Sequence, residues 1–175
     1  MVLSLPPRGW PLPILIVLQQ QLGIPIVLTN CCQYIYSVSI DNLHGGRLAV
    51  DYLLQLGHTR IGYIANRDRE QANADRMTGY RQALQQRGIA FDPALIALGD
   101  GCLEGDKTGM RQLLALNAPP AAVFCYDDMT AIGAAAALCE AGLRVPEDIS
   151  LRWGLMTLTG RLTLTRLSLP SSAAP

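Results

Sequence analysis

Neither sign of charge is in excess in this sequence, and no apolar run is long enough to cross a bilayer. Fourteen Lys and Arg residues balance 14 Asp and Glu residues, which argues against a dedicated nucleic-acid surface, because such a surface needs extra cations to replace phosphate counterions. A spanning helix needs about 18 or more consecutive apolar residues, which the sequence lacks. The short apolar stretch 14–18 is crowded by prolines and no cleavage site follows it, so we expect no secretory leader and a cytoplasmic protein.

Motifs for catalysis and metal binding are also missing. The sequence contains no GxSxG elbow, no P-loop and no GxGxxG after a strand, and its only histidines are His44 and His58. Its five cysteines, which include no CxxC pair, are Cys31, Cys32, Cys102, Cys125 and Cys139. We therefore predict reduced thiols, no metal site, no cofactor and no enzymatic activity.

What the sequence does contain is a repeated order of helix, glycine and strand. In the helix expected over 46–56, apolar residues recur with a 3.6-residue period, and Gly57 then reverses the chain. The apolar strands IGYIA and AAVFCY show no alternation, which is typical of parallel strands that are buried on both faces. The sequence thus predicts an α/β fold with a doubly wound parallel sheet. The expected helices are 13–22, 46–56, 74–87, 105–116 and 129–141, and the expected strands are 24–29, 61–65, 95–98, 121–126 and one that opens at DISL (148–151).

Polar side chains follow the ends of these strands, where open parallel sheets bind their ligands. They are Asn30, Asn66, Arg67, Asp127 and Asp128, together with Arg76 near the start of the helix that follows 61–65. Amide, carboxylate and guanidinium groups at one edge suit a ligand with paired hydroxyls or ring nitrogens. Taken alone, the residues favour a structural alternative, in which Asp128 caps the next helix and Arg76 is solvated.

Five motifs in a fixed order give the sequence a family resemblance. They are DNLHGG (41–46), LGHTRI (56–61), RMTGYRQAL (76–84), DDMTAIGA (127–134) and GLRVPEDIS (142–150). From about 23 to 150 the chain resembles the effector-binding domain of the lac and galactose repressor family (LacI/GalR) of transcriptional regulators. The resemblance implies a fold of the periplasmic-binding-protein type, in which a small molecule binds between two α/β lobes that are joined by a hinge.

The resemblance also implies a set of effector-binding residues. The arginine of the RxxGY motif faces the effector in this family, which makes Arg76 the first expected contact. Asp127 in the DDMTAIG motif is the second and Asn30 at the end of its strand is the third. Tyr126 is either stacked on the ligand or packed in the core. Residues 38–41 are expected to form one of the hinge crossings between the lobes.

Parts of the family's architecture have no counterpart in this sequence. Family members carry an N-terminal helix-turn-helix that reads the major groove, and we expect DNA contact only through such a headpiece, which is absent here. We expect residues 1–40 to be a remnant of the N-terminal lobe, 41–150 the C-terminal effector-binding lobe and 151–175 an atypical tail. In the intact architecture, the expected partners are a sugar or nucleoside-like effector and a second copy of the chain in a homodimer.

The tail departs from the family near Arg152. The stretch RWGLMT (152–157) can be encoded so that a shifted reading frame gives VGFDD, which the family carries after DIS, and residues 166–170 permit PLTT in the same way. We therefore hypothesise a single-base frameshift near Arg152, which the nucleotide sequence tests. A divergent tail is the alternative. Loss of the final strands would uncover a sheet edge, so we expect poor solubility, or order only through 23–150.

Two other functions remain open at this point. A sugar-binding component of a transporter would share the fold and the cleft, but it would need a secretory leader. A non-functional remnant of a regulator gene would bind neither effector nor DNA, and a binding scan with sugars separates it from a working sensor.

Overall fold

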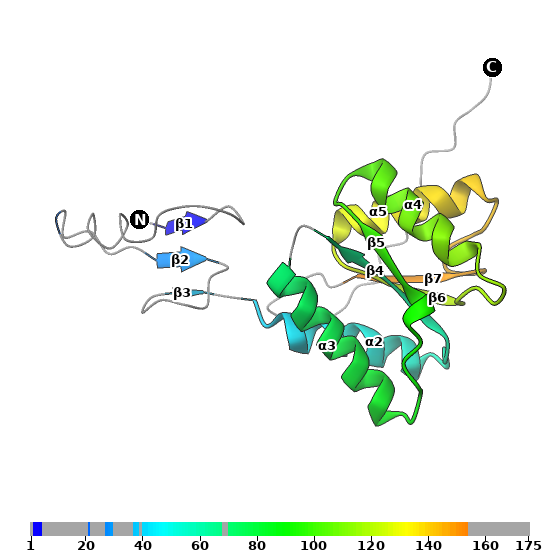
Figure 1. Cartoon of the computed structure of the whole chain (residues 1–175), viewed down its shortest axis with the longest axis horizontal. Coiled ribbons are helices and arrows are strands. Elements are labelled where there is room, and N and C mark those ends of the chain that lie inside the picture. Colours follow the sequence, from blue (N-terminus) through cyan, green and yellow to red (C-terminus); the bar gives the residue numbers. More distant parts are fainter. Residues whose placement is uncertain are drawn as a thin grey trace, which may run out of the picture.

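The larger part of the structure, a computed structural model, is a four-stranded parallel sheet with two helices on each face (Figure 1). Residues 2–4, 21, 27–29, 37–38, 40–67 and 70–153 are described. The strands of the large sheet are β4 (Ile61–Asn66), β5 (Ile96–Gly99), β6 (Ala122–Cys125) and β7 (Ser150–Trp153). The helices are α2 (Asn42–Gln55), α3 (Glu70–Gln86), α4 (Leu103–Leu114) and α5 (Asp128–Glu140), and a short 3-10 helix, Pro93–Leu95, precedes β5.

Three short strands near the N-terminus form a second parallel sheet in the order β1–β2–β3. They are β1 (Val2–Ser4), β2 (Val27–Thr29) and β3 (Ser37–Val38). The strand β2 confirms part of the one expected over 24–29. The expected helix 13–22 and the expected hinge crossing 38–41 lie wholly or partly outside the described residues, and Asn30 lies outside them as well.

Successive residues of the central strands point to opposite helix layers. Tyr63 of β4 packs with Phe124 of β6 in the core that α2 and α3 cover, whereas Ile64 packs in the core that α4 and α5 cover. The two rings stack with centroids 4.8 Å apart, a contact worth about 0.5–1.5 kcal/mol beyond its buried area. Every residue of β4 is buried, as a parallel strand between two layers requires. The predicted α/β fold with a doubly wound parallel sheet is therefore confirmed.

Several helices begin earlier than the apolar periodicity predicts. The helix α2 starts at Asn42 instead of 46, because the Asp41 side chain accepts a hydrogen bond from the amide of His44 at 2.9 Å and so caps the first turn. The helix α3 likewise starts at 70 instead of 74. The helix ends are closer to expectation, since the chain reverses at Gly88 and Gly142, whose φ angles of +67° and +72° favour glycine.

The strand order β5–β4–β6–β7 places a topological switch between β4 and β6. From β4 the chain passes through α3 to β5 on one side, and then through α4 to β6 on the other side of β4. In doubly wound sheets, a ligand crevice opens beyond the carboxyl ends of the strands at such a point. The residues that follow β4 and β6 are therefore where this fold places a site.

Candidate functional site

The candidate site lies at the carboxyl edge of the sheet, beside the switch between β4 and β6. Asn66 ends β4 and is buried, and Tyr126 and Asp127 follow β6 directly. Because the two strands are parallel neighbours, their ends meet at the same edge. The helix α3 adds Arg76 to this edge, since its guanidinium reaches the carbonyl oxygen of Tyr126.

Arg76 is held in place by groups from two other elements. Its Nε donates to Oδ1 of Asn42 at 2.9 Å, and its Nη1 donates to the carbonyl of Tyr126. The guanidinium carbon also lies 4.3 Å from the centroid of the Tyr126 ring, a cation–π contact. The helices α2 and α3 can approach this closely because Gly46 lacks a side chain, and a Cβ there would lie 2.6 Å from the carbonyl oxygen of Arg76. The guanidinium is therefore fixed in place, and it contacts the residue that precedes Asp127 at the carboxyl edge of the sheet.

Asp127 combines a capping role with an unused carboxylate oxygen. Its Oδ1 accepts from the amide of Thr130 at 2.9 Å and from the Thr130 hydroxyl at 2.8 Å, so Asp127 is the N-cap of α5. The alternative that Asp128 is the cap is wrong: the extended backbone that a cap needs occurs at Asp127, and Asp128 is already helical. Within the described residues, Oδ2 of Asp127 makes no hydrogen bond, which leaves an acceptor at the carboxyl edge.

Tyr126 is a buried residue, with 5% of its surface exposed. Its ring belongs to the core that α2 and α3 cover, and Arg76 lies over the ring. Of the two roles expected for Tyr126, its position favours packing, since its buried ring stacks against the guanidinium of Arg76.

The buried phenol of Tyr63 lies beneath this cluster and remains neutral. Burial raises its pKa, and the positive charge of Arg76 offsets this rise only in part. The Tyr63 hydroxyl donates to Oδ1 of Asn73 on α3 at 2.8 Å. This bond ties α3 to the centre of the sheet and so fixes the turn of α3 that carries Arg76.

Sequence reasoning missed three polar residues at this edge: Asn42, Asn73 and Asp106. The partnerships of Asn42 and Asn73 depend on how α2 and α3 pack, and nothing local in the sequence indicates them. Asp106 had a usable signal, because it lies four and seven residues before Met110 and Leu113, on the face of α4 that the helical period turns to the core. A carboxylate at a core-facing helical position is unusual enough to be noted.

No group of three His, Cys, Asp or Glu side chains in the described part of the chain is arranged to hold a metal ion. In the same residues, no helix has the length and apolar character that crossing a membrane requires.

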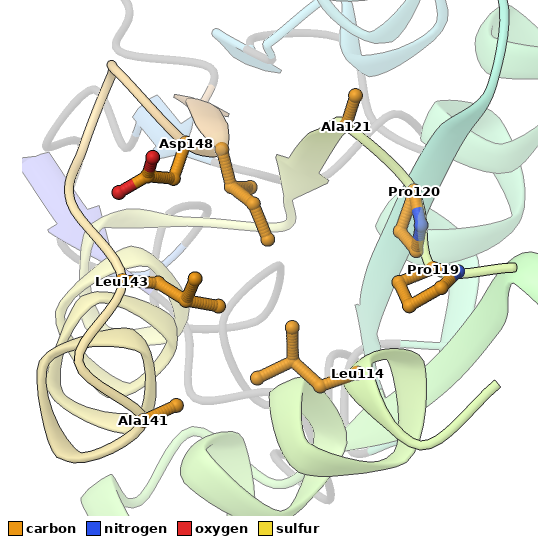
Figure 2. Close-up of a pocket in the computed structure, with 8 residues that line it drawn as sticks. Leu114, Pro119, Pro120, Ala121, Ala141, Leu143 and Asp148 are labelled. Carbon is orange, nitrogen blue, oxygen red and sulfur yellow. The ribbon is translucent and has the colours of Figure 1, made fainter.

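A groove of about 460 Å³ lies at the opposite, amino edge of the sheet (Figure 2). Its lining is almost entirely apolar and consists of Leu114, Pro119, Pro120, Ala121, Ala141, Leu143, Asp148 and Ile149. The one charged member, Asp148, already accepts hydrogen bonds from Nε and Nη2 of Arg144 at 2.8 and 2.9 Å. The groove thus lacks the convergent polar groups that a small-molecule site uses to orient its ligand.

Comparison with known proteins gives the family to which the chain belongs. A family model described as a periplasmic binding protein-like domain matches residues 50–154. The chain belongs to this family. The matched residues of this periplasmic binding protein-like domain include β4 to β7 and both Arg76 and Asp127.

The relatives of this domain are transcriptional regulators. The chain is 46% identical over 115 residues to the HTH-type transcriptional repressor CytR of Escherichia coli K12, which covers 66% of this chain and 34% of the relative. The chain thus spans about a third of the length of the curated relatives it matches. The resemblance to LacI/GalR effector-binding domains is confirmed.

Solved structures of the same family share the fold. A sugar-binding transcriptional regulator of the LacI family from Escherichia coli, complexed with phosphate, superposes with a TM-score of 0.73 at 29% identity, covering 87% of this chain and 56% of that one. The transcriptional regulator CelR in complex with cellobiose gives a TM-score of 0.69 at 33% identity, covering 86% of this chain and 46% of that one.

Proposed function

We propose that this chain is a lobe that senses a small effector, a sugar or a nucleoside-like molecule, for a transcriptional regulator of the LacI/GalR type. The observation that carries the proposal is that the fixed guanidinium of Arg76 and the unused carboxylate oxygen of Asp127 lie at the same edge of the sheet, at its switch point. A planar donor set next to an acceptor suits neighbouring hydroxyls or ring nitrogens. The cellobiose complex of CelR supports a sugar as the ligand class.

The effector acts through a change in the balance of two states. In the intact architecture it binds one arrangement of the lobes more tightly, and the coupling shifts operator affinity by about 1–3 kcal/mol. DNA contact belongs to a helix-turn-helix headpiece, and the lobe itself acts in the cytoplasm without catalysis. Asn30, which follows Thr29 in the sequence, is proposed as a further contact. The parts 1–40, 41–150 and 151–175 are proposed as a remnant of the N-terminal lobe, the effector-binding lobe and an atypical tail, for which the frameshift near Arg152 is our hypothesis.

We further propose that two copies pair through the side that carries α4 and α5. Four large apolar side chains there are 42–53% exposed, namely Leu98, Leu103, Met129 and Ile132. They lie on β5, α4 and α5, and α4 packs against both of the other two elements. Replacing Ile132 by Asp is expected to convert a dimer into a monomer in sedimentation velocity, whereas Leu56→Asp, at an exposed site just after α2, is expected to leave the dimer intact. A monomeric wild-type chain would contradict the pairing.

The effector proposal is tested by calorimetric titration of the full chain with cellobiose, D-galactose, D-ribose, cytidine and adenosine. At least one sugar or nucleoside is expected to bind, and Arg76→Met is expected to weaken its affinity about 10- to 100-fold, as loss of charge-assisted hydrogen bonds predicts. The matched control is Arg81→Met, because Arg81 lies on the same helix but stacks on Phe91 at 4.2 Å instead of reaching the site. Binding that Arg76→Met leaves unchanged would contradict the site, and a folded chain that binds none of the probes would favour a non-functional remnant.

A further inference from the structure

A carboxyl group is completely buried beside the candidate site. Asp106 of α4 has no exposed surface and lies on the same helical face as the core residues Met110 and Leu113. Its Oδ1 accepts from the amides of Asp100 and Gly101 at 3.2 and 3.4 Å. Its Oδ2 is buried and has no hydrogen-bond partner among the described residues. Buried polar atoms without a partner are rare, so this position calls for an explanation beyond helix formation.

Two glycines make room for this carboxyl. A Cβ on Gly99, the last residue of β5, would overlap Oδ1 of Asp106, and a Cβ on Gly133 of α5 would overlap the Asp106 Cβ. The carboxyl is therefore enclosed by β5, α4 and α5 together. An exposed surface aspartate would not need such clearance, and the fit indicates that the three elements are packed around this side chain.

The segment that Asp106 holds is part of the carboxyl edge. Gly101 adopts a φ of +76°, and a Cβ there would lie 3.0 Å from Nδ2 of Asn66, the residue that ends β4. The segment is also tied internally, since Oδ1 of Asp100 accepts from the amide of Cys102 at 2.9 Å. Asp100 to Cys102 thus form a loop that adjoins the switch-point strand, and its shape depends on the two amide bonds to Asp106.

The charged surroundings of Asp106 are acidic. Asp100 of the loop and Asp127 at the start of α5 both disfavour a second negative charge there, and the Cys125 thiol of β6 is a near neighbour. Lys107 does not compensate, because its ammonium donates to Glu104 and Glu140. Burial raises the pKa of Asp106, and the two amide bonds oppose that rise only in part.

We propose that Asp106 is a positioning residue of the effector site, whose buried carboxyl holds the Asp100–Cys102 loop in the shape that forms one wall of the site. The expected effect on effector affinity rests on the proposed function, whereas the hydrogen bonds that hold the loop are present in the chain without any ligand. Asp106 touches no ligand. It acts through the amides of Asp100 and Gly101 and through the packing that those amides fix against Asn66.

The hold on the loop is tested by NMR on the full wild-type chain, with no ligand present. The amide protons of Asp100 and Gly101 are expected to shift together as pH rises through the Asp106 pKa, with a midpoint above that of an ordinary aspartate. Asp106→Asn is expected to abolish this titration. Asp100→Asn, which removes one charge from the same loop but keeps the Asp106 carboxyl, is expected to preserve it at Gly101. Amides without a transition of raised midpoint, or a transition of raised midpoint that persists in Asp106→Asn, would overturn the proposal.

The effect on the site is tested by the affinity for whichever of the five probes binds. Asp106→Ala removes the acceptor for both amides and is expected to raise Kd about tenfold, because the loop is then no longer held in the shape that the site needs. Asp106→Asn keeps an Oδ1 acceptor and is expected to restore most of the affinity, which a role in packing alone would not predict. If Asp106→Ala lowers the melting temperature but leaves Kd unchanged, the positioning role is wrong. If the wild type binds no probe, the proposed function fails, and the amide titration alone decides whether Asp106 holds the loop.

Discussion

Both edges of the four-stranded sheet carry charged side chains, but they use them in opposite ways. At the amino edge, the charges pair locally on the surface: Arg144 with Asp148, and Arg60 with Asp92 at 3.1 Å. The groove at this edge is lined mostly by apolar side chains (Figure 2). At the carboxyl edge, Arg76 is bonded to a neutral amide and a carbonyl, so its positive charge is not neutralised by a paired carboxylate in the described residues.

This difference indicates that charges at the amino edge serve folding stability, whereas charges at the carboxyl edge are available for ligand binding. In a surface ion pair the two charged groups bind each other, so neither is available to bind a ligand. Such pairs contribute little to folding stability. A guanidinium held by neutral groups keeps its charge available to a ligand. Because the protein already fixes its orientation, a ligand does not have to order it on binding. We therefore expect changes at the carboxyl edge to alter affinity and changes at the amino edge to alter stability alone.

After Arg76, the largest effect is expected at Asp127, where the capping role and the binding role can be separated. Asp127→Ala removes both the cap and the carboxylate, so it is expected to cost about 1 kcal/mol of folding stability and about tenfold or more in affinity. Asp127→Ser keeps a capping oxygen and is expected to retain the stability but lose the affinity. Thermal melts and calorimetric titration of both variants measure this. Wild-type affinity in Asp127→Ser would show that Asp127 is a cap and nothing more.

The sequence predicts those features of the fold that depend on local patterns of residues, namely the sheet type and the helix ends. The apolar runs without alternation and the glycines after helices predict a parallel sheet, and a parallel sheet brings Arg76 and Asp127 to one edge. The partners of Arg76 could not be predicted, because Asn42 reaches it across two helices whose separation depends on Gly46. The cap of α5 was assigned one residue too late, since adjacent aspartates give the same sequence signal and only the backbone angles distinguish them.

Arg152 differs from the charged residues of both edges, because it is a buried cation that belongs to neither. It lies within β7, is 7% exposed, and its Nε has no partner among the described residues. The guanidinium carbon lies 4.8 Å from the centroid of the Tyr52 ring of α2. Among the described residues, this is the one contact that compensates for burial of the charge. Burial lowers the pKa of Arg152. An arginine that the fold does not use here is consistent with the hypothesis that the reading frame shifts near this residue.

Arg152→Met is therefore expected to raise the stability by about 1 kcal/mol, because an unpaired buried donor is removed while most of the packing volume is kept. The measurement is a urea unfolding midpoint. Arg81→Met is the matched control, since it removes an arginine stacked on an aromatic ring at an exposed site and so relieves no buried donor. A destabilised Arg152→Met variant would mean that the contact with Tyr52 outweighs the unpaired donor.

The smallest effect is expected at the amino edge, at Asp148. Hydrogen bonds from the Arg144 side chain and backbone lower the pKa of Asp148 to about 2. Because the folded-state pKa lies below the unfolded value of about 3.9, the ionised carboxylate stabilises the fold above pH 4, and this contribution is lost as pH falls from about 4 to 2.

Asp148→Asn is accordingly expected to melt slightly below the wild type at pH 7, with the difference disappearing by about pH 2. Glu147→Gln is the matched control, because it removes a charge from the same loop without removing the carboxylate that Arg144 binds. The effector affinity of Asp148→Asn at pH 7 is expected to equal that of the wild type. A loss of affinity would break the comparison between the two edges, because it would mean that a locally paired charge on the far side of the sheet still takes part in binding.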